Sequence, residues 1–257
     1  MSGIGLIELM IALTLSAVLM QGLFQLYITI KQQFLYQQAL SNIQQSIRVT
    51  HMLLGQSLRS DGSLGCLNIK NLPRSMQTLF DIKPVLPKHR GDMIWVRQVK
   101  PLYHLQAPVK PAETTLHIQE KLKVSENQFF VISNCRDAEI VQISDKSRFS
   151  KKTGTVLTVS KSLRGHYDLT AYIGWFESKL FYVAQTSRKN SRGEPIFALY
   201  SNDIREGVNE IVEGIVDLHV EPLTNLSNAH GLRMNITAQD IEITSLQRTW
   251  VEEVWFR

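Results

Sequence analysis

Residues 2–20 read SGIGLIELMIALTLSAVLM and carry a single charged side chain, Glu8, at the start of a long apolar segment. From Leu9 to Ile30, about 22 residues pass without a charge. A helix rises about 1.5 Å per residue, so a helix of this length covers a hydrocarbon core of about 30 Å. The segment is therefore predicted to cross a membrane once, and Lys31 ends it.

A cleaved secretory signal fits this N-terminus badly. Such a signal has a charged start and an apolar region of about 7 to 15 residues, followed by small residues at a cleavage site. Here the apolar run begins almost at Met1 and continues to Ile30. The pattern indicates a membrane anchor.

The helical pattern continues beyond the apolar segment, because residues 31–60 contain no proline and only Gly55 as a glycine. Apolar residues recur there in steps of three, four or seven, which places them on one stripe of a helix: Tyr36, Leu40, Ile43, Ile47, Leu54 and Leu58. The opposite face is rich in glutamine: Gln32, Gln33, Gln37, Gln38, Gln44 and Gln45. We predict one helix from about Ile4 to about Arg59, some 80 Å long.

The amphipathic half of this helix needs a surface to pack on. A coiled-coil stalk would need sustained a/d heptads flanked by charged e and g positions, and the neighbouring residues are mostly Gln and Ser. Packing on a sheet of the same chain is the favoured interpretation.

The remainder of the chain has the texture of a β-rich domain. Two glycines in SDGSLGC, residues 60–66, end the helix, and three prolines follow before Gly91. After Gly91, short β-rich runs alternate with turn signals; the runs include DMIWVRQV, QFFVIS, EIVQIS, KLFYVAQ, IVDLHVEPL and LRMNITAQ. Ile215 and Leu218 alternate with Asp217 and His219, which is typical of a half-buried antiparallel strand.

The predicted fold class is therefore α+β. A long N-terminal helix has a transmembrane half, residues 4–30, and an amphipathic half, residues 31–60. It packs on an antiparallel β-rich domain that covers residues 61–257.

The charge of the chain is mildly basic, with 28 Lys and Arg against 23 Asp and Glu and a net charge of +5. This balance suits an acidic partner, a phosphate backbone or a lipid surface without selecting one. No run of clustered Lys and Arg with interleaved aromatics stands out, so a solvated basic surface is favoured over a nucleic-acid site.

Catalytic and metal-binding patterns are absent from the sequence. The seven histidines are scattered without metal-ligand spacing, and there is no Cys-x-x-Cys, His-Glu-x-x-His or Gly-x-Ser-x-Gly motif. Glu252 and Glu253 are adjacent in a predicted strand and are expected to point to opposite faces. We expect no catalytic residues, no metal and no cofactor, and an enzyme is disfavoured.

The residues GIGLIELM, 3–10, resemble the type III signal of type IV pilins and pseudopilins. The resemblance implies a three-residue leader, residues 1–3, that a membrane-embedded prepilin peptidase removes between Gly3 and Ile4 before methylating the amine of Ile4. It also implies that Glu8 pairs with such an amine on a neighbouring subunit. The alternative for Glu8 is an acid near the cytoplasmic interface of the membrane, where its cost is small. Ile4 replaces the usual Phe or Met, Gly5 replaces the usual Ser or Thr, and the leader MSG has no basic residue.

The helix-to-loop junction QQALSNIQQSIRVTHMLLGQSLRSDGSLGC, residues 37–66, is similar to that of PilW-type minor pilins. SNCRDAEIVQI, IVEGIVDLHV and the ending RTWVEEVWFR also look like segments of that family in the expected order. The resemblance implies a minor pilin of an inner-membrane priming or tip complex, with its C-terminal domain in the periplasm. Its implied partners are other minor pilins, the major pilin, the prepilin peptidase and the inner-membrane assembly platform.

Two alternatives stay open beside the minor pilin. One is a type II secretion pseudopilin at the pseudopilus tip, and the other is a tip adhesin or a pilin for DNA uptake. Nucleic acid is the weaker candidate ligand, since the sequence has no clustered basic patch.

The implied export to an oxidising periplasm gives the two cysteines a meaning. There Cys66 and Cys135 are expected to form a disulfide that closes a loop of about 70 residues and ties the segment after the helix to a strand. Two buried free thiols are the alternative.

Overall fold

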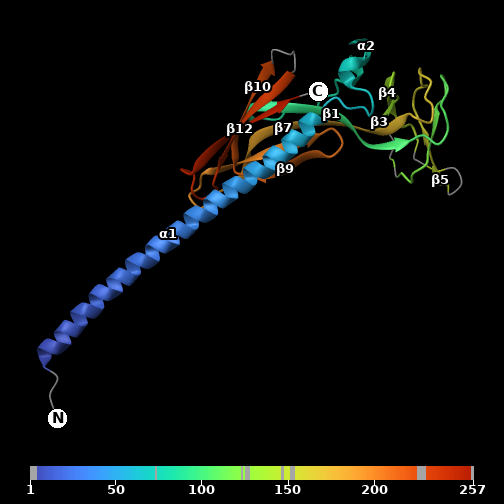
Figure 1. The fold of residues 1–257 in the computed structure, drawn as a ribbon. Helices are drawn as coiled ribbons and strands as arrows, with labels where there is room; N and C mark the ends of the chain where they lie inside the picture. Colours follow the sequence, from blue (N-terminus) through green and yellow to red (C-terminus); the bar gives the residue numbers. More distant parts are fainter. Residues whose placement is uncertain are drawn as a thin grey trace.

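The computed structural model consists of one long helix that extends from a β-rich domain (Figure 1). It describes residues 5–72, 74–122, 124, 128–145, 148–150, 154–224 and 230–255. Helix α1 covers Leu6–Arg59, and its first half projects away from the domain without contact to it. It is long and apolar enough to cross a membrane, and its most apolar window has no buried residue. The chain thus has the organisation of a single-pass membrane protein with a β-rich domain after the anchor.

One stripe of α1 packs on the domain, starting at Ala39. The buried residues recur in steps of three and four: Ala39, Ile43, Ile47, Thr50, Leu54 and Leu58. This confirms most of the predicted stripe, with Leu40 half-buried beside it. Tyr36 was predicted on this stripe, and that prediction is wrong, because its side chain is 47% exposed. Tyr36 has the right helical phase but lies before the first helical turn that the domain covers.

The end of α1 matches the prediction, since the helix stops at Arg59. Gly62 adopts φ +77°, a left-handed conformation that glycine tolerates and other residues rarely adopt. Its N–H donates to the carbonyl of Arg97 at 2.6 Å, and the N–H of Arg97 donates to Oδ1 of Asp61 at 2.8 Å. The chain therefore leaves the helix already attached to the first strand.

Three short helices are described in the proline-containing segment between α1 and Gly91. They are η1 (Ile69–Asn71), α2 (Arg74–Gln77) and η2 (Thr78–Phe80). Leu64, Ile69, Leu72 and Phe80 of this segment form a small core with Val99, Val131 and Phe176 of the adjacent sheet.

Three antiparallel sheets build the domain, as the alternating patterns predicted. The largest sheet has the order β4-β3-β7-β8-β9, and β1 pairs with the other edge of β7. Its strands are β1 (Arg90–His104), β3 (Phe129–Ser133), β4 (Ala138–Gln142), β7 (Tyr172–Lys189), β8 (Pro195–Asp203) and β9 (Gly207–Glu213). The second sheet consists of β10 (Ile215–Thr224), β11 (His230–Gln239) and β12 (Gln247–Trp255). The third consists of β2 (Thr115–Ile118), β6 (Gly154–Thr158) and β5 (Arg148–Ser150).

Strands β5 and β9 were not predicted from the sequence. Strand β9 reads GVNEIVE, and its first five residues are exposed, so it lacks the buried alternation that marks a half-buried strand. It lies at the edge of its sheet, where polar and charged side chains are tolerated.

The main core lies between α1 and the first two sheets. It joins the buried stripe of α1 to residues of both sheets, among them Val96, Phe181, Leu199, Leu218 and Val254. Helix α1 contacts β11 and β12 on one side and β9 on the other, so it lies in the trough that the two sheets form. A separate hydrophobic core fills the part of the domain around Phe130, Leu157 and Tyr167, here called the far lobe.

Ile43 and Tyr36 give a direct test of which residues anchor α1. Replacing Ile43, which is 1% exposed, with alanine should lower the free energy of unfolding by about 2–5 kcal/mol, because it leaves a cavity in the core. Tyr36→Ala should change it by no more than about 0.5 kcal/mol. Urea unfolding in detergent measures both, and equal losses in the two variants would contradict the observed start of packing at Ala39.

Candidate functional site

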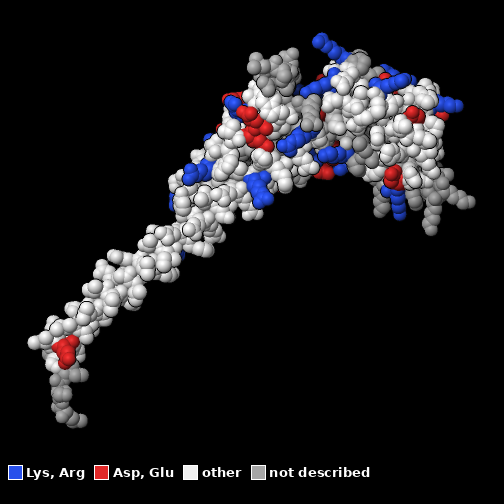
Figure 2. All heavy atoms as spheres, in the orientation of Figure 1, with Lys and Arg blue, Asp and Glu red and all other residues white. Residues whose placement is uncertain are grey.

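The membrane half of α1 carries one carboxylate, that of Glu8. In residues 5–30 it is the only charged side chain, and Figure 2 shows acidic side-chain atoms near the free end of the helix and otherwise uncharged residues along its first half. It lies in the first turn, where the unpaired backbone N–H groups favour negative charge. Its carboxylate is exposed and has no partner among the residues that the structure describes. Gly3 and Ile4, the predicted processing residues, lie outside the described residues.

A charged contact of α1 lies where the helix meets β12, between the exposed His51 and the mostly buried Glu252. Nε2 of His51 lies 2.7 Å from Oε1 of Glu252. Gly55, one turn further along, faces the same carboxylate, and a Cβ there would lie 3.4 Å from Oε1, at ordinary van der Waals distance. The guanidinium of Arg59 lies on the same side of the helix, 3.6 Å from that Cβ position. A single acidic side chain of the sheet thus faces three successive turns of α1.

This contact was not predicted, although the sequence contains a signal for it. His51, Gly55 and Arg59 are spaced by four residues and therefore share one helix face. Glu252 was considered only together with Glu253. Their predicted opposite orientation is confirmed: Glu253 points outward, and its Oε1 accepts from Nη2 of Arg233 at 2.8 Å.

The surroundings of Glu252 make its ionised form costly. Burial raises the pKa of Glu252 above the ordinary value of 4.5, and the nearby His51 and Arg59 oppose this only in part. One oxygen, Oε2, is buried and has no hydrogen-bond partner in the described part of the chain. The contact of Glu252 with His51 therefore fixes how α1 lies along β12. Its free-energy cost is that of keeping the buried carboxylate ionised.

The two cysteines meet as predicted. Cys66, after the helix, is bonded to Cys135, in the turn between β3 and β4, with 5.3 Å between their Cα atoms and a sequence separation of 69. Nearby, the hydroxyl of Ser133 donates to the carbonyl of Leu64. The disulfide ties the segment that follows α1 to the end of β3, so the alternative of two free thiols is not what the structure shows.

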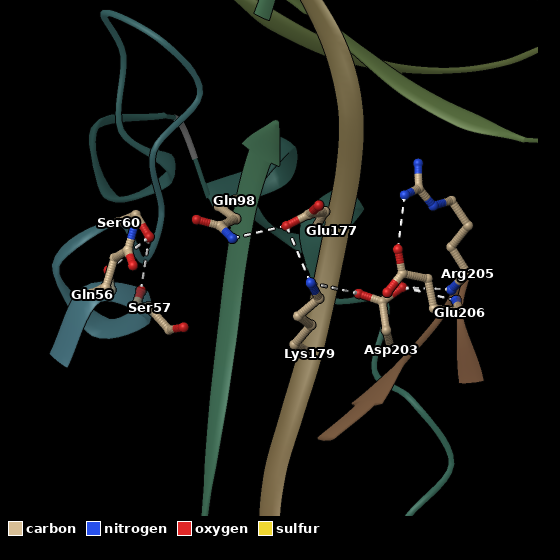
Figure 3. A network of polar contacts seen from close by, with 9 residues as sticks. All are labelled: Gln56, Ser57, Ser60, Gln98, Glu177, Lys179, Asp203, Arg205 and Glu206. Carbon is tan, nitrogen blue, oxygen red and sulfur yellow. Dashed lines mark hydrogen bonds and ion pairs between the residues drawn. The ribbon is translucent and has the colours of Figure 1, made fainter. Parts of the chain in front are cut away.

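A polar network crosses β1, β7 and β8 on the side of the helix end (Figure 3). Nε2 of Gln98 donates to Oε2 of Glu177 at 2.8 Å. Nζ of Lys179 lies 3.7 Å from Glu177 and 3.9 Å from Oδ2 of the buried Asp203. The backbone N–H of Arg205 donates to Oδ1 of Asp203 at 2.7 Å. The network joins three strands, with the neutral Gln98 on β1 and the charged Glu177, Lys179 and Asp203 on β7 and β8, so its arrangement is that of a structural tie.

The described residues hold no group of three or more His, Cys, Asp or Glu side chains that could bind a metal ion. In the far lobe, the half-buried carboxylate of Glu139 accepts from the backbone N–H groups of Arg164 and Gly165 and from the hydroxyl of Tyr167. Burial together with this carboxylate raises the pKa of Tyr167. Because Glu139 is saturated with donors, the contact holds a loop in place.

No protein-family model, curated protein or solved structure matches this chain. The function is therefore inferred from the sequence, the fold and the surfaces of the protein.

The buried carboxylate at the helix–sheet contact predicts a pH dependence. A folded-state pKa above the unfolded value means that the native protein binds the proton more tightly, so this group's contribution to stability is lost as pH rises through the raised pKa. The Glu252→Gln variant has no such loss. The free energy of unfolding of this variant should therefore rise relative to that of the wild type as pH rises from about 4.5 to neutrality. Urea unfolding at a series of pH values measures the difference.

Glu253→Gln is the matched control, because it changes the same side chain on the exposed face of the same strand. An equal change of slope in both variants would show that the buried position has no special effect.

Proposed function

We propose that this protein is a minor pilin that takes part in type IV pilus assembly, within a priming or tip complex of the inner membrane. The observation that carries the proposal is the apolar half of α1, which is exposed along its length and bears Glu8 in its first turn. An apolar surface of this kind needs lipid or other helices around it. The match of residues 3–10 to the pilin processing signal selects assembly over simple anchoring.

The proposed role of Glu8 follows from the cost of a charge in lipid. A lone acid near the centre of a membrane costs about 2.5–3.5 kcal/mol on insertion scales, and a cationic partner offsets that cost. Cleavage after Gly3 would create an amine on Ile4, four residues or about 6 Å before Glu8. The same amine on a neighbouring subunit can pair with Glu8 when apolar helices bundle, and the pairing would set their axial register.

The β-rich domain would then stand in the periplasm, close to the membrane. Its contact with α1 begins at Ala39, eight residues after Lys31, which corresponds to about 12 Å along the helix. The disulfide between Cys66 and Cys135 agrees with an oxidising compartment. The contact between α1 and β12 at Glu252 would hold the domain in a fixed position relative to the membrane anchor. A subunit that connects the membrane to a tip complex requires such a fixed position.

Mass spectrometry of the N-terminus tests the proposal. Expressed with an active prepilin peptidase, the protein should begin at Ile4 and carry one added methyl group, whereas without the peptidase it should keep the residues before Ile4. An intact leader in the presence of a peptidase that processes a control pilin would refute the proposal.

Glu8→Gln separates processing from assembly in the same system. The variant should be cleaved like the wild type, because the peptide bond after Gly3 is unchanged, but it should co-purify less with the other minor pilins. Gln44→Glu, a change of one charge at an exposed position outside the membrane half, serves as the control for charge alone. Unchanged co-purification of the Glu8 variant would remove the pairing role while leaving the processing result intact.

A further inference from the structure

Lys179 and Asp203 lie directly opposite each other on the neighbouring antiparallel strands β7 and β8. Directly opposed residues of an antiparallel pair point to the same face of the sheet. Nζ of Lys179 lies 3.9 Å from Oδ2 of Asp203, which is beyond hydrogen-bond length. The fold therefore holds an amine and a carboxyl group side by side without a hydrogen bond between them (Figure 3).

The carboxyl group of Asp203 is buried, and its two oxygens have different surroundings. The side chain is 2% exposed. Oδ1 accepts from the backbone N–H groups of Arg205 at 2.7 Å and Glu206 at 3.2 Å. Oδ2, the oxygen nearer to Lys179, has no hydrogen-bond partner among the residues that the structure describes. A buried carboxylate oxygen without a partner is costly, and an ion pair at this distance offsets that cost poorly.

A second carboxylate, that of Glu177, lies on the other side of the same amine (Figure 3). Glu177 precedes Lys179 by two residues in β7, so both side chains point to the same face. Its Oε2 lies 3.7 Å from Nζ of Lys179 and accepts from Nε2 of Gln98 at 2.8 Å. The side chain of Glu177 is 15% exposed and that of Lys179 is 26% exposed. A proton acceptor is therefore fixed beside the amine in a site that is largely shielded from water.

We propose that Lys179 and Asp203 condense to an isopeptide bond that joins β7 to β8 covalently. Unprotonated Nζ attacks Cγ of Asp203, the Nζ–Cγ bond forms, and the Cγ–Oδ2 bond breaks. Counted from the ammonium and the carboxylate, two protons leave the nitrogen and depart with Oδ2 as one water molecule, so the step needs no other reagent. The inference rests on the geometry of this site and not on the pilin function proposed above.

The groups around the pair match what this reaction requires. Glu177 accepts a proton from the attacking nitrogen and delivers it to Oδ2 as that oxygen leaves, which is general base and then general acid catalysis. Negative charge develops on Oδ1 in the tetrahedral intermediate. The two backbone N–H groups that already donate to Oδ1 would stabilise this charge, as in an oxyanion hole.

The fold supplies the proximity that the condensation needs. Well-oriented groups within one molecule react as if at effective concentrations of about 10⁵–10⁸ M. The reacting atoms must come within about 3–3.5 Å, and the flexible stem of Lys179 allows that approach. The product would remove two charges and the unpartnered oxygen of Asp203 from the interior of the domain.

Intact mass spectrometry of the full-length protein tests the proposal without any variant. After reduction of the disulfide and allowance for N-terminal processing, the wild type should be lighter than its sequence by one water molecule. Trypsin digestion and tandem mass spectrometry should then give one branched peptide in which Lys179 is linked to Asp203. This location is decisive, because an aspartate followed by glycine, such as Asp61, can lose water within its own backbone.

Lys179→Arg should have the full mass of its sequence, because a guanidinium stays protonated and does not attack. Lys189→Arg is the matched control: Lys189 lies in the same strand but opposite Pro195, so this variant should still lack one water. A wild-type protein of full sequence mass would overturn the proposal. A water deficit that maps elsewhere, or that persists in Lys179→Arg, would also overturn it.

The rate of condensation tests the role of Glu177. Glu177→Gln keeps an oxygen that can accept from Gln98 but removes the proton acceptor, so the bond should form at least about tenfold more slowly. The measurement is the fraction of chains that have lost water at intervals after cell-free synthesis into lipid nanodiscs. Equal rates in the variant and the wild type would contradict the role of Glu177.

Discussion

The burial of one stripe of α1 between two sheets is the interaction on which the rest of the structure depends. Ile43 and Leu54 complete the main core, in which residues of the sheets around β7 and β10 also pack on one another. The same continuous helix extends without a break into a half that has no protein around it. The domain is therefore fixed in height and rotation relative to the segment that would lie in the membrane.

Two carboxylates are associated with α1, and they differ in whether the chain supplies a counter-charge. Glu252 is buried where α1 meets β12, and the cost of its charge is offset in part within the chain by His51 and Arg59. Glu8 lies in the apolar half and has no counter-charge among the described residues. An uncompensated acid in lipid is the feature that most requires a partner outside the chain, which is why assembly rather than catalysis is the function proposed for this protein.

Local signals made much of the fold predictable from the sequence. The end of α1 at Arg59, most of the β-rich runs and the disulfide between Cys66 and Cys135 followed from turn residues, alternation and the implied compartment. The start of packing on α1 did not, because Tyr36 has the periodicity of a buried residue and only the extent of the domain leaves it exposed. Strand β9 and the contact between His51 and Glu252 were missed for a related reason. Both depend on which strands lie beside the helix, and the order of strands in a sheet is set by long-range pairing that no local pattern contains.

Accessibility of spin labels along α1 in lipid nanodiscs tests the central claim most directly. Single labels placed at successive positions from Leu9 to Leu58 report contact with oxygen dissolved in lipid, with a water-soluble relaxant, or with neither. The account predicts lipid contact on all faces up to about Ile30, water contact on all faces from Lys31 to Gln38, and a protected stripe that begins at Ala39 and returns at Ile43 and Ile47. Water contact throughout the first half, or a protected stripe that begins before Lys31, would contradict it.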